Sequence, residues 1–114
     1  MIDFACKRFE IEDIVRCGFG LSKADYQILV SLMKNSDNGL TTKELADVLK
    51  LDLSTCQRSV KKLFEKEIIS RSQFNLNSGY LYKYSIRDKK LIKEKILFII
   101  RGWVGGVETS IKSW

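Results

Sequence analysis

Two helix-start signals lie close together near the middle of the chain, and they limit its fold more than any other feature. Thr41 and Glu44 have the spacing of a capping box, in which each side chain hydrogen-bonds the backbone of the other residue. Ser54 and Gln57 repeat that spacing shortly afterwards. The sequence therefore predicts two helices joined by about three to four residues, which is typical of a helix-turn-helix.

The second of these helices is expected at residues 55–67, and a hairpin pattern follows it directly. The apolar repeat changes there from the period of a helix to the period of a strand. Residues 68–74 suit one strand, and residues 75–79 suit a turn. Tyr80 and its alternate neighbours then form one aromatic side of a second strand, which we expect to face the core. A hairpin directly after a helix-turn-helix is interpreted as a wing.

Apolar residues at helical spacing predict three more helices. The first covers residues 3–17. The next begins at Ser22, with Asp25 as the acidic partner of a cap, and a loop is expected at residues 35–39. The last covers residues 88–112. The predicted fold class is therefore mainly α with a small β-hairpin: a winged helix-turn-helix with N- and C-terminal flanking helices.

A chain of 114 residues fits one domain, and we predict a single winged helix-turn-helix domain over residues 1–114. Its parts are an N-terminal helix within 1–20, a winged-helix core over 21–87 and a C-terminal dimerisation helix within 88–114. An apolar stripe on the last helix is the predicted homodimer contact: Ile96, Ile100, Trp103, Val107 and Trp114. So much apolar surface is typical of an interface, although the helix could instead pack on its own domain.

The net charge of +6 is unevenly distributed along the chain. Residues 1–53 carry seven Lys and Arg against nine Asp and Glu, whereas residues 54–101 carry twelve against four. A positive charge gathered in one part of the chain indicates a polyanionic partner, of which nucleic acid is the commonest. A solvated, lysine-rich surface is the alternative interpretation.

The second helix of a helix-turn-helix enters the major groove with its first residues against the base edges. Gln can pair with adenine and Arg with guanine, while lysines further along contact phosphates. The predicted DNA contacts are Ser54, Thr55, Gln57, Arg58, Lys61 and Lys62 on the helix, and Arg71, Gln73, Asn75, Asn77 and Lys83 on the wing. A polar helix face and a polar hairpin tip are also common on surfaces that bind nothing.

The segment LTTKELADVLKLDLSTCQRSVKKLFEKEIISRS resembles the winged helix-turn-helix regulators of the MarR and TrmB type. The positions in register with their pattern are Thr42, Glu44, Leu45, Ala46, Ser54, Thr55, Arg58, Val60 and Leu63. Glu67 departs from that pattern where a glycine commonly closes the helix, and Cys56 departs where a β-branched residue is usual. The resemblance covers residues 21–87 and implies a sequence-specific regulator of double-stranded DNA. For the outer helices it implies a homodimer interface.

Other function classes are poorly supported by the composition. The chain has no His, so a catalytic Cys would lack its usual base, and we expect no enzyme and no cofactor. Cys6, Cys17 and Cys56 include no C-x-x-C pair, which favours free, mostly buried thiols in a reducing cytoplasm, although a thiol- or metal-responsive regulator stays an alternative. We expect no membrane span. A protein-interaction winged-helix module and an unidentified small-molecule effector also stay open.

Overall fold

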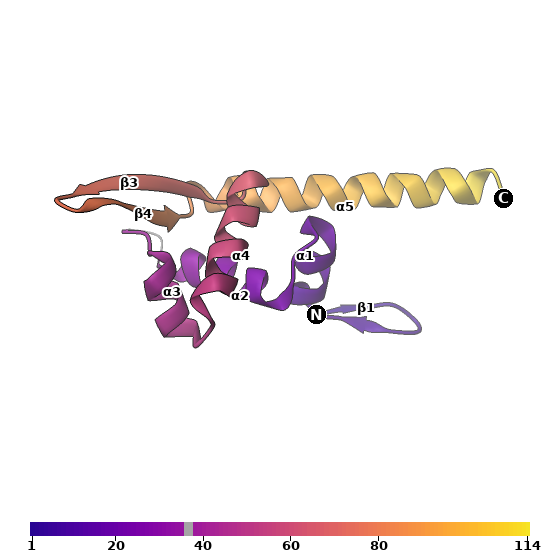
Figure 1. The fold of residues 1–114 in the computed structure, drawn as a ribbon. Helices are drawn as coiled ribbons and strands as arrows, with labels where there is room; N and C mark the ends of the chain where they lie inside the picture. The colour runs from indigo at the N-terminus through magenta and orange to yellow at the C-terminus, as the bar shows by residue number, and fades with distance from the viewer. Residues whose placement is uncertain (36–37) are drawn as a thin grey trace. The chain divides into compact units, whose positions relative to one another are not determined.

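The structure is a computed structural model that describes residues 1–35 and 38–114. Over these residues it contains five helices and two antiparallel hairpins, which confirms the predicted fold class. The chain divides into two compact units, one formed by residues 1–20 with 88–114 and the other by residues 21–87 (Figure 1). The predicted loop at 35–39 includes residues 36 and 37, which lie outside the described residues.

The unit at residues 21–87 has the order helix, helix, helix, hairpin that a winged helix-turn-helix requires (Figure 1). Its elements are α2 (Lys23–Lys34), α3 (Thr42–Leu49), α4 (Leu53–Glu65), β3 (Ser70–Leu76) and β4 (Gly79–Ser85). The three helices bury a shared core in which Leu32, Leu45 and Leu63 have no exposed surface. Burying an aliphatic side chain of this size stabilises a fold by about 1.5–3 kcal/mol, so this core orients α4.

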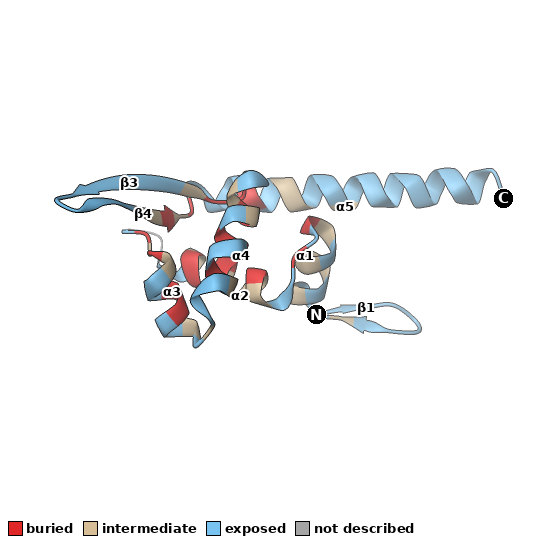
Figure 2. Cartoon of the chain, viewed as in Figure 1, coloured by how far each residue is buried: buried red, intermediate tan, exposed pale blue. Residues whose placement is uncertain are grey.

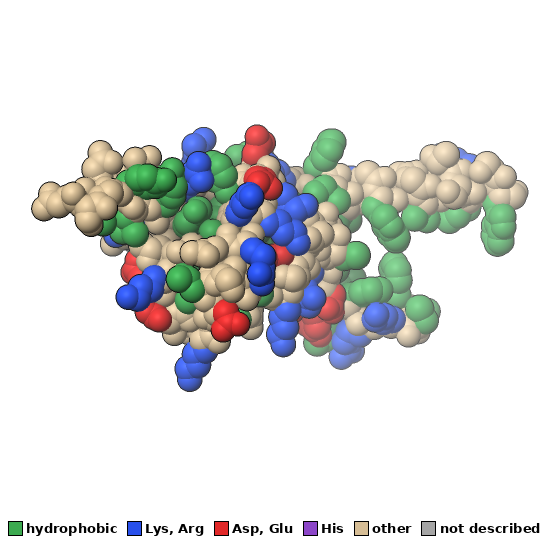
Figure 3. Space-filling model, in the orientation of Figure 1, with side chains coloured by type: hydrophobic (Ala, Val, Ile, Leu, Met, Phe, Trp, Pro, Cys, Tyr) green, Lys and Arg blue, Asp and Glu red, His purple; other side chains and the backbone are tan. Residues whose placement is uncertain are grey.

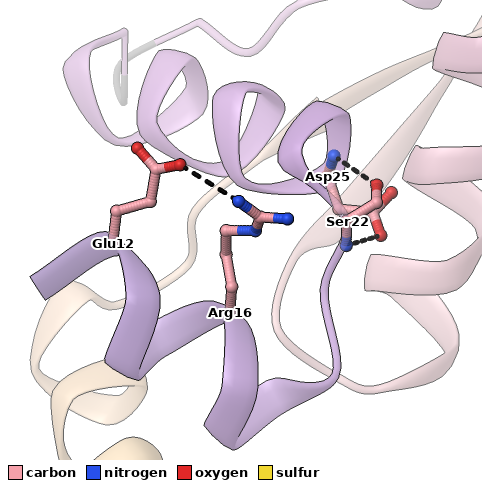
Figure 4. Close-up of polar contacts among 4 residues, drawn as sticks. All are labelled: Glu12, Arg16, Ser22 and Asp25. Atoms are coloured by element: carbon pink, nitrogen blue, oxygen red, sulfur yellow. Dashed lines mark hydrogen bonds and ion pairs between the residues drawn. The ribbon is translucent and has the colours of Figure 1, made fainter. Parts of the chain in front are cut away.

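The capping boxes predicted for α2 and α3 are confirmed. The Ser22 hydroxyl accepts the backbone N–H of Asp25 at 3.1 Å, and the Asp25 carboxylate accepts the backbone N–H of Ser22 at 2.9 Å (Figure 4). Thr41 and Glu44 make the same two bonds at the start of α3, each at 3.1 Å. Both boxes satisfy backbone donors that a helix leaves unpaired in its first turn.

The prediction that Ser54 and Gln57 form a third box is wrong. Helix α4 begins at Leu53, and its N-cap is Asp52, which makes no side-chain cap bond. The helix begins earlier than predicted because Lys50 takes a left-handed conformation, with a φ of 55°, and turns the chain directly after α3. Ser54 therefore lies inside the first turn of α4.

The end of α4 is also earlier than predicted, at Glu65 instead of residue 67. The N–H of Ile68 donates to the carbonyl of Leu63 and the N–H of Glu67 donates to the carbonyl of Phe64, both at 3.0 Å. These are the two bonds of a Schellman motif, in which Glu67 takes the left-handed position with a φ of 60°. The turn forms without the glycine that usually occupies this position.

The strands of the wing extend further towards its tip than predicted, and the turn is shorter. Leu76 pairs with Gly79, so the turn contains only residues 77 and 78. A third short segment joins the sheet at its base, because Leu40 and Tyr84 exchange backbone hydrogen bonds of 2.8 Å in both directions. Gly39 permits this approach, since its φ is +72° and a Cβ there would lie 2.9 Å from the carbonyl oxygen of Tyr84.

The aromatic side of β4 is buried only at its base, which corrects the prediction that its tyrosines face the core. Tyr84 is buried, Tyr82 is partly buried and Tyr80 is exposed. The two strands continue beyond the helices, and every residue from 71 to 81 is exposed. The outer tyrosines therefore have no hydrophobic core to enter.

The other unit contains β1 (Ile2–Asp3), β2 (Arg8–Phe9), α1 (Ile11–Phe19) and α5 (Lys89–Lys112). The predicted helix at 3–17 is wrong in its first half, because residues 2–9 form a small hairpin. The Arg8 guanidinium contacts the Asp3 carboxylate at 2.8 Å, and the rings of Phe4 and Phe9 meet edge to face with their centres 5.7 Å apart. These contacts favour strand pairing over helix in this segment.

Helix α1 packs against α5 where Gly18 lacks a side chain. A Cβ at Gly18 would lie 2.5 Å from Cδ1 of Ile96 and 3.8 Å from Cγ2 of Ile99. Within α1, the Arg16 guanidinium contacts the Glu12 carboxylate at 3.4 Å (Figure 4). Helix α5 continues without a break to Lys112, although it contains three glycines in its second half.

The expectation of mostly buried thiols is wrong for two of the three cysteines. Cys6 and Cys17 are exposed and only Cys56 is buried. Cys6 lies in the turn between β1 and β2, which has no core beneath it, and Cys17 lies on the outward side of α1. All three cysteines are free thiols.

Candidate nucleic-acid interface

Helix α4 separates an apolar side from a polar side. Cys56, Val60 and Leu63 are buried among the helices of the unit, together with the small side chain of Ser59. Ser54, Gln57, Arg58 and Lys61 are exposed, and Thr55 is partly exposed. Lys and Arg side chains gather over α4 in the space-filling view (Figure 3), while the ribbon coloured by burial shows red only along the inner side of the helix (Figure 2).

Four of the exposed residues of α4, which also include Leu53 and Glu65, form one continuous polar stripe. Ser54, Gln57, Arg58 and Lys61 follow the i, i+3, i+4, i+7 spacing that places side chains on one face of a helix. A hydroxyl, an amide, a guanidinium and an ammonium then lie in order from the first turn of the helix to its third. We call these four residues the α4 stripe. It can offer hydrogen bonds to base edges near the helix start and a positive charge further along.

Lys62 belongs to a different environment from its neighbour Lys61. Its ammonium lies 2.9 Å from the carboxylate of Asp25, which is 95% buried as a side chain. Burial raises the pKa of Asp25, but hydrogen bonds from Ser59, Lys62 and Ser22 outweigh this effect and hold the pKa below its ordinary value of 3.8. Lys62 therefore joins α4 to the start of α2, and its ammonium faces a carboxylate within the same unit.

The wing residues predicted to contact DNA fall into separate groups. The Arg71 guanidinium lies over the rings of Phe64 and Tyr82, at 4.3 and 4.4 Å from their centres. Lys83 lies over the ring of Phe74 at 5.3 Å. Both cations are thus placed against aromatic rings, which is a favourable arrangement for a positive charge.

The polar residues of the wing occupy the same side of the hairpin as Arg71. The amide nitrogen of Gln73 donates to the side-chain oxygen of Asn75 at 3.3 Å, and both residues are exposed. Asn77 lies in the two-residue turn. The eleven residues from 72 to 82 carry no charge, so the projecting part of the wing is neutral. Its outer surface appears as apolar and uncharged groups in Figure 3.

Sequence reasoning missed the residues that hold these groups in place. Asp25 was recognised as a cap but not as the partner of Lys62, because 37 positions separate the two residues. Tyr82 was expected to face the core, whereas it and Phe64 are partly exposed and contact Arg71. The spacing of the aromatic residues predicts which side of a helix or strand they occupy, but it does not predict which cation they contact.

Four of the five predicted dimerisation residues lie on α5, Trp114 follows the C-terminal end of the helix, and the five differ in exposure. Ile96 and Ile100 are partly buried, while Trp103 is 64% exposed and Trp114 is fully exposed. Every residue from 101 to 114 is exposed (Figure 2). The second half of α5 therefore presents an apolar stripe that is partly to fully exposed.

Within residues 1–35 and 38–114, no helix combines the length and hydropathy that a membrane span needs. The same residues hold no group of three His, Cys, Asp or Glu side chains that could bind a metal ion. Burial and the nearby Asp52 carboxylate raise the pKa of the Cys56 thiol.

A family model described as the DnaD N-terminal domain matches residues 10–104 of the chain. An uncharacterized protein of Methanocaldococcus jannaschii is 25% identical over 108 residues, which cover 95% of this chain and 85% of that protein. A solved structure from Methanosarcina mazei Go1, described as a possible transcriptional regulator, has a TM-score of 0.92 and 46% identity. That match covers 100% of this chain and 96% of the other.

More distant solved structures share the fold. A MarR protein from Peptoclostridium difficile has a TM-score of 0.57 and 23% identity, and it covers 91% of this chain and 65% of its own. The complex of MepR from S. aureus with DNA has a TM-score of 0.58 and 17% identity, and the match covers 88% of this chain and 81% of the MepR chain. At these identities the likeness shows a winged-helix fold and leaves membership of the MarR or TrmB type a prediction.

Proposed function

The chain belongs to the DnaD N-terminal domain family, and on that premise we propose that it is a sequence-specific, double-stranded DNA-binding transcriptional regulator that acts as a homodimer. The observation that carries this proposal is the α4 stripe, whose polar groups are exposed while the opposite side of the helix is buried. The description of the Methanosarcina mazei structure as a possible transcriptional regulator supports it, as does the DNA complex of the MepR fold.

In the proposed complex α4 lies in the major groove. Ser54, Thr55, Gln57 and Arg58 are near the start of the helix, where side chains of this motif reach base edges. Gln57 suits adenine and Arg58 suits guanine, because each can make two parallel hydrogen bonds to that base. Lys61 lies a turn later and contacts phosphate. The wing, residues 68–87, lies on the backbone or in the minor groove.

Homodimerisation through α5 would determine the symmetry and half-site spacing of the DNA site. The proposed contact is the stripe at Ile96, Ile100, Trp103, Val107 and Trp114. Two copies related by a twofold axis would bind two half-sites centred about one DNA turn, or about 34–36 Å, apart. The expected operator is therefore a pseudo-palindrome.

Selection of bound duplexes from a random pool tests the proposal. The wild-type protein should enrich one sequence, and its affinity should fall steeply with salt. Arg58→Ala should cost about 1–3 kcal/mol of binding free energy and relax the preference at one base position. Arg101→Ala is the matched control, because it removes an exposed arginine that belongs neither to the α4 stripe nor to the proposed dimer residues of α5. An Arg58→Ala variant with the binding profile of wild type would contradict the placement of α4 in the major groove.

A protein-interaction module is the second candidate, and one observation favours it. The wing is uncharged from residue 72 to residue 82, and Phe74 and Leu76 are about half exposed on one side of it. An exposed apolar surface is more typical of a protein partner than of phosphate. This candidate gains support if the random pool gives no enriched sequence and wild type binds duplex DNA no better than Arg58→Ala does.

A further inference from the structure

The outer part of the wing lacks the packing that would fix its direction. Its base is held by the buried Tyr84 and by the backbone bridge from Leu40 to Tyr84. Beyond that point every residue from 71 to 81 is exposed. A two-stranded hairpin is marginally stable on its own, so contacts other than burial must set its angle to the helices.

A row of stacked side chains supplies such contacts. The Arg71 guanidinium on β3 lies over the Phe64 ring, in the last turns of α4, and over the Tyr82 ring on β4. The row continues outward, because the Tyr82 and Tyr80 rings meet edge to face at 5.2 Å. Arg71 and Tyr82 lie on the same side of the hairpin, since Arg71 pairs with Tyr84 and Gln73 pairs with Tyr82.

We propose that Arg71 is a positioning residue that fixes the wing relative to α4 by stacking on Phe64 and Tyr82, and that it does not act as a phosphate contact. Stacking uses the flat faces of the guanidinium, so a lysine with the same charge cannot replace it. Removal of Phe64 should have the same effect as removal of Arg71, although Phe64 brings no charge to a DNA surface. The consequence for DNA binding rests on the proposed function, whereas the consequence for the free protein does not.

Residual dipolar couplings of the free protein test the positioning role directly. In wild type the backbone couplings of residues 72–82 and of α4 should fit one common orientation. Arg71→Lys and Phe64→Leu should each reduce the couplings of the wing while those of α2 and α4 stay unchanged, which also shows that both variants are folded. Equal couplings in wild type and Arg71→Lys would overturn the proposal.

DNA affinity provides a second test, with a double-mutant cycle between Arg71 and Phe64. Arg71→Lys, Arg71→Met and Phe64→Leu should each weaken binding by about three- to tenfold, the range expected for loss of a partly exposed cation–π pair. Phe64→Leu combined with Arg71→Met should weaken it no further, because each single change removes the same stack. Wild-type affinity in Arg71→Lys, or additive losses in the double variant, would show a charge contact instead.

Lys61→Met is the matched control in this series, because it removes a positive charge from the α4 stripe. It should lower the slope of log affinity against log salt by about 0.9, as expected for one lost phosphate contact. Phe64→Leu combined with Lys61→Met should show additive losses. If wild type fails to bind any duplex, the proposed function fails, and the dipolar couplings still decide the role of Arg71.

Discussion

Helices α4 and α5 are both amphipathic, but their apolar sides have different surroundings. In α4 the apolar side chains Val60 and Leu63 are buried inside their own unit. In α5 the apolar stripe is exposed along the second half of the helix, where Trp103 is 64% exposed, and Trp114 beyond the helix end is fully exposed. The same periodicity in a sequence therefore predicts a helix in both cases, and only the structure shows which apolar side is already buried.

The largest expected effect concerns the exposed stripe of α5. Trp103→Asp should raise the dissociation constant of the proposed dimer by about 1,000-fold, or ~4 kcal/mol, because the proposed contact would lose a central aromatic residue and gain a charge. Analytical ultracentrifugation over a range of concentrations measures it. Wild-type protein that stays monomeric at tens of micromolar would contradict the dimer itself.

Phe98→Asp is the matched control for Trp103→Asp. Phe98 is 78% exposed and apolar, but it lies five residues before Trp103, or about 140° around the helix. It should leave the dimer intact. An equal loss of dimer affinity in both variants would mean that any exposed apolar side chain on α5 contributes to association, and that the stripe is not a specific contact.

The next effect separates the two helices by their stability. Leu63→Ala should lower the free energy of unfolding by about 2–5 kcal/mol, because it leaves a cavity in the core of residues 21–87. Leu97→Ala on α5 should change it by less than about 0.5 kcal/mol, because Leu97 is 44% exposed. Urea unfolding in a monomeric Trp103→Asp background measures both without a contribution from association. Similar losses of unfolding free energy in the two variants would contradict the proposed difference between α4 and α5.

A smaller effect concerns the ion pair that holds α4 against α2. Asp25→Asn should cost about 1–2 kcal/mol at pH 7, because the buried end of the pair with Lys62 loses its charge. The folded pKa of Asp25 is lowered, so its contribution is complete above the ordinary value of 3.8 and is lost as pH falls through the folded value. Wild type should therefore lose stability below pH 3.8 more steeply than the variant does.

Urea midpoints measured at pH 7 and at several values below pH 4 compare the two proteins. The Asp25→Asn, Lys62→Met double variant is the control for the pair, since it removes both charges. A wild-type curve parallel to that of Asp25→Asn across the acid range would show that the carboxylate contributes nothing to folding.

The smallest effect concerns the corner that sets the start of α4. Lys50 has a left-handed φ of 55°, which costs an L-residue roughly 1–2 kcal/mol. Lys50→Gly should therefore stabilise the protein by about 0.5–1 kcal/mol after the greater flexibility of glycine in the unfolded chain is counted. Thermal unfolding measures the gain. Lys50→Ala keeps the strained conformation, and a gain of equal size in that control would assign the effect to charge.

The sequence predicts the winged-helix unit well because its signals are local. The boxes at Ser22 and Thr41 each depend on a residue three positions away, so the sequence alone locates α2 and α3. The start of α4 was misplaced because it depends on the backbone of Lys50, whose left-handed conformation has no sequence signal of its own. Residues 3–9 were misassigned because their apolar spacing suits a helix, while contacts such as Phe4 with Phe9 stabilise a hairpin.

The candidate site is predictable in its types of residue but not in its contacts. The exposure of Gln57, Arg58 and Lys61 follows from helical spacing and agrees with the structure. The separate environments of Lys62 and Arg71 depend on residues far away in sequence or on the exact register of a hairpin. A list of basic side chains therefore does not distinguish Lys61 from the cations that contact a carboxylate or aromatic rings.

Cys56 lies beneath the α4 stripe, fully shielded, on the side of the helix that faces the unit's interior. A thiol reagent can reach it only when α4 opens away from its neighbours, whereas Cys6 and Cys17 are accessible at all times. The rate of Cys56 modification therefore reports how often α4 transiently detaches from its neighbours. Duplex DNA bound to α4 should lower the modification rate of Cys56. This rate would then measure the fraction of protein bound to DNA without an attached dye.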